Sequence, residues 1–457
     1  MSDIQVILQS QRDFFKTGTT LSVDFRIEQL MKLKEVITQY EYKIEEALYL
    51  DLNKDSYEAY MCEIGMTLNE LNHMIKNIKK YSKKRVKRTP LSQFASTSYE
   101  LKVPYGNVLI MSPWNYPFLL TMGPLIDALA AGNTVIIKPS NYSSHTSKVI
   151  YEMISTCFDS SYVACVQGGR EQNQELLNHK FDFIFFTGSQ NVGKVVLSHA
   201  AKFITPVVLE LGGKSPCIVD ESANIELSAK RIIFGKLINS GQTCVAPDYI
   251  LCHKEVKESL VKELIKQIQL QITKDPLNNA HYPKIINQKH FERIIRLIDE
   301  KKCVYGGKYD KATLKIEPTI MDGVTIEDAV MQEEIFGPIL PILTYENIDE
   351  VIESFHSKEK PLALYLFSNN KENIHKVTTQ IRYGGGCIND CIIHLVTTEM
   401  GFGGVGESGM GAYHGKVGFD TFSHTKSMVD KKNWIDLPMR YHPYKEKYKK
   451  LVKMFLG

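Results

Sequence analysis

The chain has 457 residues, of which 43% are hydrophobic and 23% charged, so it is long enough for about three globular domains and is not a low-complexity protein. Its 55 basic and 52 acidic residues give a net charge of +3, which is too balanced for a protein whose main partner is nucleic acid. The nine cysteines include no CxxC pair, which argues against a disulfide framework or a zinc ribbon. We therefore expect free thiols in a reducing compartment.

The N-terminal fifteen residues lack the basic segment and apolar core of a signal peptide. The longest apolar stretch, residues 108–132, contains Asn115, Asp127 and three prolines, so it predicts a strand, a loop and a helix instead of a membrane span. These features predict a soluble, cytoplasmic protein.

The first 80 residues are helix-like, with apolar residues at helical spacing over 25–50 and 57–78. The segment 76–88 then carries eight basic residues in thirteen and no acid. Nucleic-acid binding is one interpretation, but the near-neutral charge of the whole chain favours a solvated helix end or linker. Residues 92–106 alternate as an extended strand does.

From 105 to 210, short β-rich segments alternate with helical patterns. The expected strands are 107–111, 134–138, 162–166, 181–186 and 206–211, and the expected helices are 117–131, 145–158 and 191–203. This alternation predicts a doubly wound parallel sheet, which binds ligands at the carboxyl ends of its strands. A second α/β run extends from 215 to about 418, and a β-like segment at 423–430 precedes a basic tail.

Two segments are candidates for holding a nucleotide. In FFTGSQNVGKVV (185–196), a strand is expected to turn on Gly188 and to enter a helix near Gly193, where backbone N–H groups can face a pyrophosphate. The spacing is GxxxxG, so a plain strand-to-helix turn remains an alternative. Lys138 ends a strand, and its ammonium either reaches ribose or phosphate oxygens or is simply solvated.

Three further residues could carry chemistry. Glu210 ends an apolar strand beside a glycine pair, where burial would raise its pKa and suit a general base; a surface ion pair is the alternative. Cys244, in NSGQTCVAPDY, follows a helical pattern and is either an exposed, activated thiolate or an inert buried thiol. Asn115 lies in the proline-bracketed loop SPWNYPF, where its amide either donates to an oxyanion or bonds its own backbone.

Taken together, these segments resemble the NAD(P)-dependent aldehyde dehydrogenase superfamily. Six motifs occur in the family's order and spacing: SPWNYPF, AGNTVIIKPS, FTGSQNVGKVV, LELGGKSP, GQTCVAPDY and EEIFGPILP. The sequences GQTCVAPDY and SGMGAYHGKVGFDTFSHTKS (408–427) are most similar to the class 3 branch. The resemblance implies the family's three-layer α/β fold with a Rossmann-type cofactor domain.

The domains that the resemblance implies are a dinucleotide-binding domain (1–81 and 104–210), a catalytic domain (211–418), a β bridging and oligomerisation element (82–103 and 419–432) and a basic amphipathic tail (433–457). In the family the bridging element pairs strands across a two-fold axis, so a homodimer is expected.

The resemblance also implies the catalytic roles. Cys244 would be the nucleophile, Asn115 and the backbone N–H of Cys244 would hold the oxyanion, and Glu210 would activate water. The implied cofactor is NAD or NADP. The family positions that bind it are Trp114 and Lys138 on the adenosine side, Gly188, Ser189 and Gly193 at the pyrophosphate, Leu211 and Gly212 under the nicotinamide, and Glu334 and Phe336 at its ribose and ring.

One position departs from the family pattern. The KPS motif is often followed by a glutamate that binds the adenosine ribose and repels a 2′-phosphate, whereas this chain has the neutral Asn141. We therefore expect NADP to be tolerated and to rival NAD.

The substrate side is less defined by sequence. Tyr116 is expected to line an apolar entrance, and His414 to lie at the substrate mouth, since no metal-ligand spacing accompanies it. The tail is expected to place one apolar helical face opposite its lysines, formed by Tyr444, Tyr448, Leu451, Val452, Phe455 and Leu456. Packing at a dimer interface is favoured over a helix beside the substrate mouth or weak contact with an anionic membrane. Because the chain stops at Gly457, no membrane anchor is expected.

The resulting hypothesis is oxidation of a medium- or long-chain aliphatic, aromatic or polyene aldehyde to its acid. A CoA-acylating reductase is disfavoured because such relatives usually lack the general-base glutamate. A catalytically silent binding protein on the same fold would not need Cys244, Glu210 and Asn115 together.

Overall fold

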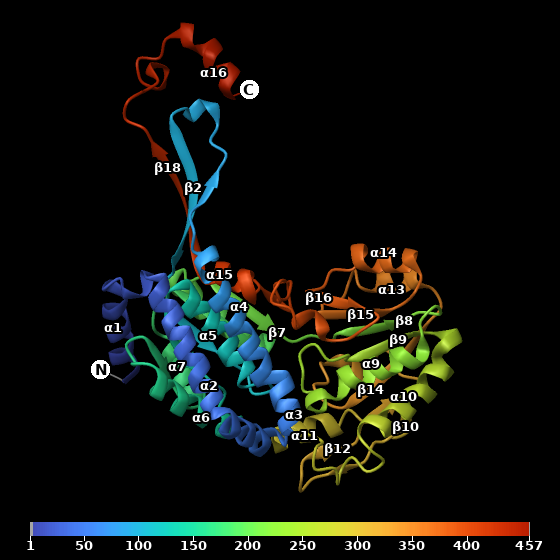
Figure 1. Cartoon of the computed structure of the whole chain (residues 1–457). Coiled ribbons are helices and arrows are strands. Elements are labelled where there is room, and N and C mark those ends of the chain that lie inside the picture. The colour runs from blue at the N-terminus through green and yellow to red at the C-terminus, as the bar shows by residue number, and fades with distance from the viewer. Residues whose placement is uncertain (1–2, 457) are drawn as a thin grey trace.

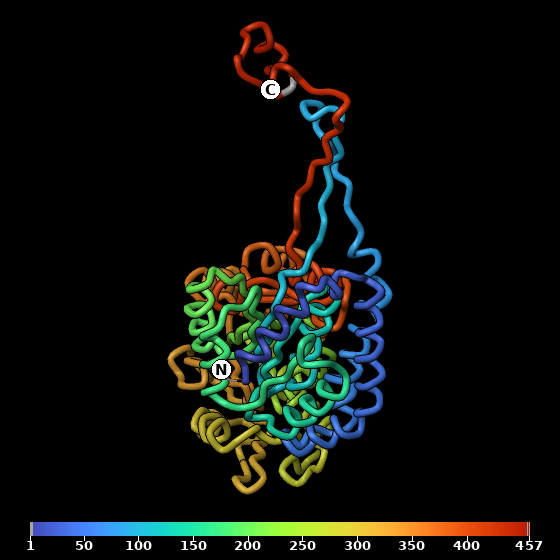
Figure 2. The backbone as a smooth tube through the Cα atoms, turned by 90° about the vertical axis from the view of Figure 1, so that its left-hand side faces the viewer, coloured from blue at the N-terminus to red at the C-terminus, as the bar shows by residue number. Residues whose placement is uncertain are grey.

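The computed structural model describes residues 3–456; the side chain of Phe455, expected on the apolar face of the tail, lies outside the described part. The chain forms a body of two α/β lobes, from which a narrow arm projects and carries the C-terminal segment at its tip (Figure 1). Seen from the side, the arm stands clear of the body along its whole length (Figure 2).

A six-stranded sheet in the order β17-β7-β6-β3-β4-β5 forms the centre of the first lobe. Its strands are β3 (Asn107–Met111), β4 (Thr134–Lys138), β5 (Val163–Cys165), β6 (Phe183–Gly188), β7 (Val207–Leu211) and the antiparallel β17 (Gly409–Met410). Val108 packs into one core cluster and its neighbour Leu109 into another, so both faces of the sheet are buried. A strand buried on both faces is continuously apolar, and this pattern allowed these strands to be predicted from the sequence.

Helices cover both faces of this sheet (Figure 1). They are α1 (Asp3–Lys16), α2 (Val23–Leu52), α3 (Ser56–Ala59), α4 (Gly65–Tyr81), α5 (Leu119–Ala131), α6 (Ser144–Cys157), α7 (Arg170–Leu177), α8 (Gln190–Phe203) and α15 (Gly415–Thr421). A π-helical segment, Tyr60–Ile64, joins α3 to α4.

The second lobe contains a seven-stranded sheet in the order β10-β13-β14-β9-β8-β15-β16. Its strands are β8 (Pro216–Val219), β9 (Tyr249–His253), β10 (Cys303–Tyr305), β13 (Thr319–Met321), β14 (Ile339–Tyr345), β15 (Ala363–Phe367) and β16 (Gly385–Ile388), and β11 (Tyr309–Asp310) pairs with β12 (Lys315–Ile316) separately. Its helices are α9 (Ile225–Leu237), α10 (Lys257–Gln271), α11 (Gln288–Ile295), α12 (Ala329–Gln332), α13 (Ile348–Ser354) and α14 (Lys371–Gln380).

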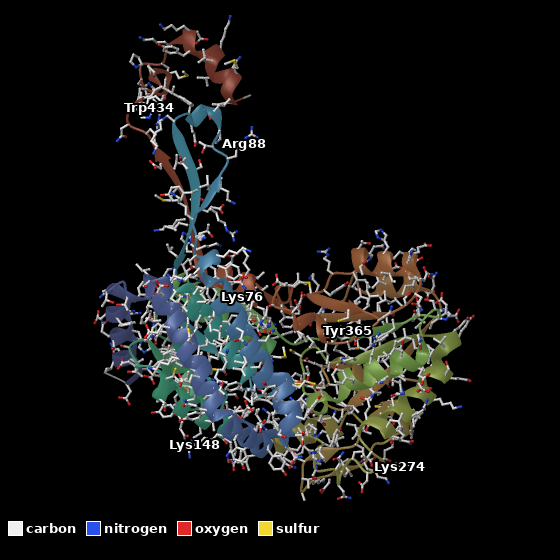
Figure 3. The ribbon with its side chains drawn as sticks, in the orientation of Figure 1. Lys76, Arg88, Lys148, Lys274, Tyr365 and Trp434 are labelled. Carbon is white, nitrogen blue, oxygen red and sulfur yellow. The ribbon has the colours of Figure 1, made fainter. Side chains whose placement is uncertain are left out.

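The arm is an antiparallel three-stranded sheet of β1 (Arg85–Lys87), β2 (Ser96–Pro104) and β18 (Ser423–Lys431), with β2 in the middle. The basic run 76–88 therefore spans the end of α4, a turn and the exposed edge strand β1. Figure 3 shows Lys76 at the base of the arm and Arg88 on the arm itself.

The α/β fold with parallel sheets agrees with the sequence prediction, and two details differ. First, β17 and α15 pack on the first sheet and its helices, although the sequence placed residues up to 418 with the second α/β unit. Glycine-rich residues carry no periodicity, so this return of the chain has no local signal. The division into three domains otherwise stays a prediction.

Second, the tail is less helical than expected. The helix α16 covers only Lys449–Leu456; a 3-10 turn, Glu446–Tyr448, precedes it, and Tyr444 lies before both. A 3-10 turn has about three residues per turn, so it does not continue the face of an α-helix. Leu451, Val452 and Leu456 line a groove with Leu91 and Phe94 at the tip of the arm, far from the body. Among residues 3–456, no helix is both long and apolar enough to span a bilayer.

Candidate active site

A cavity of about 290 Å³ opens where the carboxyl ends of the parallel strands of the first sheet face the second lobe. The loop after β3 supplies Asn115, the end of β7 supplies Glu210, and the loop after α9 supplies Cys244, so the three predicted catalytic residues share one cavity. Of the predicted cofactor residues, the cavity is lined by Trp114, Gly188, Ser189, Leu211, Gly212, Glu334 and Phe336.

Three predicted cofactor residues do not line this cavity. Lys138 is buried, its Nζ donates to the carbonyl oxygen of Pro139 at 2.8 Å, and burial lowers its pKa to about 8. Asn141 is exposed. Gly193 is buried in α8, where a Cβ would lie 2.8 Å from Leu211.

Two glycines keep the wall of the cavity free of side chains. A Cβ on Gly188 would lie 2.6 Å from the Phe186 ring, and a Cβ on Gly212 would lie 2.1 Å from Oε2 of Glu334. Glu334 is held by the backbone N–H of Gly213, and burial, followed by the nearby Asp248 carboxylate, raises its pKa to about 8. Backbone exposed in this way allows the close approach that a pyrophosphate and ribose need.

Aromatic rings form a second wall. The Trp114 ring lies 5.3 Å from the Phe336 ring, edge to face, and 5.0 Å from the His290 ring. Burial lowers the pKa of His290 to about 4, so this ring is neutral at physiological pH. His290 had no sequence signal, since a lone histidine in a helix carries no motif. Flat apolar rings, bare glycines and a buried carboxylate are together the surroundings that a nicotinamide dinucleotide fits.

The backbone before Cys244 makes an unusually sharp turn. Asn239, Ser240 and Gly241 all have left-handed conformations, with φ of 51°, 52° and 75°. At Gly241 a Cβ would lie 2.3 Å from the carbonyl oxygen of Gly337, so only glycine fits. Non-glycine residues in this region cost about 1–3 kcal/mol each, and such strain clusters at functional sites. This turn positions Cys244 in the wall of the cavity.

The turn is anchored from behind by the second sheet. The Tyr365 hydroxyl, on β15, donates to the carbonyl oxygen of Val245 at 2.5 Å, and Ser215 Oγ donates to that of Cys244 at 3.5 Å. Figure 3 shows Tyr365 inside the second lobe. The sequence analysis did not single out either residue, because neither lies near Cys244 in the chain.

The sequence left open whether Cys244 is an exposed, activated thiolate or a buried thiol. In the structure it is half-buried, and burial, followed by the charges of Glu210 and Glu334, raises its pKa above the ordinary value. The protein alone therefore keeps this thiol protonated. A cation next to the sulfur would lower the pKa again.

Glu210 has the environment expected of a base. It is 2% exposed, burial raises its pKa well above the ordinary value, and within residues 3–456 its Oε1 has no hydrogen-bond partner. A buried oxygen left free in a polar cavity is available to a water or a substrate atom.

Asn115 is buried and firmly held. Its Nδ2 donates to the carbonyl oxygen of Gln242 at 3.0 Å, and its own carbonyl accepts from Asn239 Nδ2 at 2.8 Å. The side-chain amide has two N–H donors, so one remains for a ligand in the cavity.

A second cavity, of about 210 Å³, meets the first at Cys244 and Leu120, which line both. Its wall is almost wholly apolar and includes Met61, Cys62, Met66, Phe234, Ile238, Ile392, Ile393, Leu395, Val396 and Phe402. The predicted mouth residues Tyr116 and His414 line it as well; Tyr116 donates to or accepts from Thr243 at 2.7 Å, and His414 stacks on Tyr413. We call this second cavity the apolar tunnel.

Comparison with known proteins places these features in a family context. The Aldehyde dehydrogenase family model matches residues 1–428. The chain is 47% identical over 457 residues to a 4,4'-diaponeurosporen-aldehyde dehydrogenase of Staphylococcus aureus, covering all of both chains. It is 43% identical over 430 residues to the dimeric NADP-preferring aldehyde dehydrogenase of Mus musculus, covering 94% of this chain and 95% of the relative.

Solved structures of aldehyde dehydrogenases are also similar to this chain. The substrate-bound state of Staphylococcus aureus AldH superposes with a TM-score of 0.98 at 46% identity and full coverage of both chains. The indole-3-acetaldehyde dehydrogenase AldA of P. syringae, in complex with NAD+, has a TM-score of 0.85 at 25% identity, over 94% of this chain and 89% of that one. The expectation of NAD or NADP agrees with these names and titles.

Proposed function

Because the chain belongs to the aldehyde dehydrogenase family and is therefore an oxidoreductase, we propose that it oxidises hydrophobic aldehydes to carboxylic acids, with NAD or NADP accepting the hydride. The observation that carries the proposal is that two cavities of different chemistry meet at Cys244. One has bare glycines, aromatic rings and buried carboxylates, and the other is an apolar tunnel.

Catalysis begins at the sulfur. The Cys244 thiolate adds to the carbonyl carbon, and the carbonyl oxygen becomes an oxyanion in a thiohemiacetal. The free N–H of Asn115 and the backbone N–H of Cys244 would donate to this oxygen and stabilise its charge. When bound, the nicotinamide supplies a hydride acceptor, and its positive ring favours the thiolate that burial alone disfavours.

Glu210 acts in the second half of the reaction. Loss of hydride leaves a Cys244 thioester, which water must attack. The free oxygen of Glu210 accepts a proton from that water, hydroxide adds to the thioester carbon, and the C–S bond breaks to release the acid and regenerate the Cys244 thiolate, while the proton remains on Glu210 until it passes to solvent. The raised pKa of Glu210 makes its carboxylate form a stronger base than the carboxylate of an exposed glutamate.

Both cofactors are proposed to work. Lys138 lies at the end of β4 and Asn141 shortly after it, and neither position offers a carboxylate that would repel a 2′-phosphate. The Mus musculus relative is named NADP-preferring, which supports the proposal. Asn141→Glu is expected to shift the preference towards NAD.

The apolar tunnel favours medium- or long-chain aliphatic, aromatic or polyene aldehydes. A wall of methionine, isoleucine, leucine and phenylalanine side chains binds hydrocarbon and offers few partners to a polar substrate. The diaponeurosporen-aldehyde in the name of the Staphylococcus aureus relative is consistent with this class.

The arm supports a proposed homodimer. Both β1 and β18 are edge strands, and Val86, Met428 and Val429 on them are exposed. Exposed apolar edge strands are ready to pair with another chain. Light scattering at increasing concentration is expected to give twice the chain mass.

The experiment that tests the function follows absorbance at 340 nm with decanal or benzaldehyde and either NAD or NADP, without CoA. Reduced cofactor is expected with the intact protein and not with Cys244→Ala. Activity that requires added CoA would contradict the hydrolytic reaction. Silence of the well-folded protein with every aldehyde and both cofactors would refute the proposal.

A further inference from the structure

A buried ion pair lies behind the active site, in the connection between α2 and α4. Lys54 and Glu63 are both 0% exposed, and Nζ of Lys54 donates to Oε1 of Glu63 at 2.5 Å. Neither residue lines either cavity. Burying two charges is costly, and an apolar pair often gives equal or higher stability, so stability alone does not account for this pair.

The remaining hydrogen bonds and the ring contact of the two side chains fall on residues 115–119, and the Glu58 carboxyl lies near the Lys54 charge. Nζ of Lys54 donates to the carbonyl oxygen of Asn115 at 3.4 Å and lies 4.3 Å from the centre of the Tyr116 ring. Oε2 of Glu63 accepts from the backbone N–H groups of Phe118 at 2.8 Å and Leu119 at 3.2 Å, where α5 begins. The pair thus holds the backbone that follows the Asn115 side chain, from the Asn115 carbonyl to the start of α5.

The same connection reaches the cysteine turn. Oε1 of Glu58 accepts from the backbone N–H of Asn239 at 2.8 Å. Nδ2 of Asn239 donates to the carbonyl oxygens of Asn115 at 2.8 Å and Gln242 at 3.2 Å. The Asn115 carbonyl therefore receives hydrogen bonds from both the ion pair and the strained turn that carries Cys244.

We propose that the Lys54–Glu63 pair is a positioning device that fixes the Asn115 amide relative to Cys244. The inference rests on the proposed function, because Asn115 matters only if an oxyanion forms. A donor stabilises an oxyanion only from the right place, and a misplacement of about 1 Å can cost about 10²-fold in rate. Lys54 and Glu63 touch no reacting atom, so they are positioning residues.

The test variant is Lys54→Met combined with Glu63→Gln. Glutamine keeps an oxygen for the N–H groups of Phe118 and Leu119, and methionine fills the space of the lysine, so neither member of the pair leaves an unpaired charge. Glu58 loses the nearby Lys54 charge, so its pKa, which burial already raises to about 6, should rise further and favour its neutral form. We expect melting temperature and cofactor Kd close to wild type. The kcat for decanal should fall by about 10- to 100-fold, less than the ~10²–10³ lost when an oxyanion donor itself is removed, with KM nearly unchanged.

A double-mutant cycle with Asn115→Ala separates positioning from general stability. If the pair acts through Asn115, adding the two substitutions to Asn115→Ala lowers kcat no further than about 2-fold. Additive losses would overturn the inference, as would full kcat in the pair variant. Should that variant not fold, Glu63→Gln alone enters the same cycle. A wild-type protein that oxidises no aldehyde would refute the proposed function itself.

Discussion

The apolar tunnel allows a quantitative prediction, because each methylene group that the substrate buries against its wall should raise kcat/KM. Burying one CH₂ group contributes about 0.8 kcal/mol, which is about a 4-fold gain in kcat/KM. The kcat/KM of aliphatic aldehydes should therefore rise by about this factor per carbon until the chain emerges at the rim. Part of the rim is formed by Val396, which is 50% exposed, whereas Val245 beside the nucleophile is fully buried.

The perturbation is Val396→Asp. It replaces two methyl groups at the rim with a hydrated carboxylate, so a long substrate loses the burial of about one to two methylenes. This corresponds to about a 4- to 15-fold lower kcat/KM for decanal. Butanal, which stays near Cys244, should keep its wild-type value. The assay measures initial rates at 340 nm with butanal, hexanal, octanal and decanal at low concentration and saturating cofactor.

The matched control is Val304→Asp. Val304 is 46% exposed on β10 and lines neither cavity, so the same substitution there should leave the whole series unchanged. Two results would refute the reasoning. One is a wild-type series with no dependence on chain length, and the other is an equal loss for butanal and decanal in Val396→Asp.

Three further predictions concern the cofactor cavity and the base. Gly212→Ala, whose Cβ would lie 2.1 Å from Glu334, should lower kcat/KM for cofactor on the order of 10- to 100-fold. Gly213→Ala should not, because its Cβ would lie 3.6 Å from the nearest atoms. Equal effects of the two variants in cofactor titrations would contradict the role of Gly212 in keeping the cavity wall open. Burial lowers the pKa of Lys138 to about 8, so its charge is lost as pH rises through 8. If the Lys138 ammonium binds the 2′-phosphate of NADP, NADP affinity should fall about tenfold from pH 7 to 9 in fluorescence titrations. NAD, which lacks the 2′-phosphate, should show little change, and parallel curves for the two cofactors would contradict this binding. Glu210→Gln should slow turnover by about 10²–10⁴-fold and leave an acyl adduct on the protein in intact-mass spectra. A slow variant without an adduct would contradict the role of Glu210 as the base that activates water.

The fold was predictable wherever burial imposes a local pattern. Residues 107–111 and 134–138 match β3 and β4 to the residue, because a strand buried on both faces must be apolar throughout. The two-residue strand β17 has no such pattern, since it exists only through its pairing with Glu210 and Leu209 of β7. The start of the tail helix at Lys449 was not predicted, because apolar spacing does not distinguish an α-helix from a 3-10 turn followed by one.

The candidate site was predictable in part for a similar reason. The carboxyl ends of parallel strands meet at one edge, so motifs that follow those strands could be expected to bring Asn115, Glu210 and Cys244 into one cavity. The apolar tunnel could not be expected in this way. Its wall comes from five distant segments, 61–66, 116–120, 234–245, 392–402 and 413–414, and its apolar side chains look like ordinary core residues in sequence. The same holds for Lys54 and Glu63, whose burial is visible only in three dimensions.

The arm has a consequence for how the protein is made. Its two long strands pair Ser96 with Lys431 and Pro104 with Ser423, so the partners of β2 on β18 leave the ribosome more than 300 residues after it. Contacts of such long range close late in folding. During synthesis, β2 must therefore wait with an unpaired edge while both lobes of the body are completed. Closure of the arm, and any assembly of two chains through it, is therefore expected late in maturation, and a chain truncated before residue 423 would keep β2 as an exposed, association-prone strand.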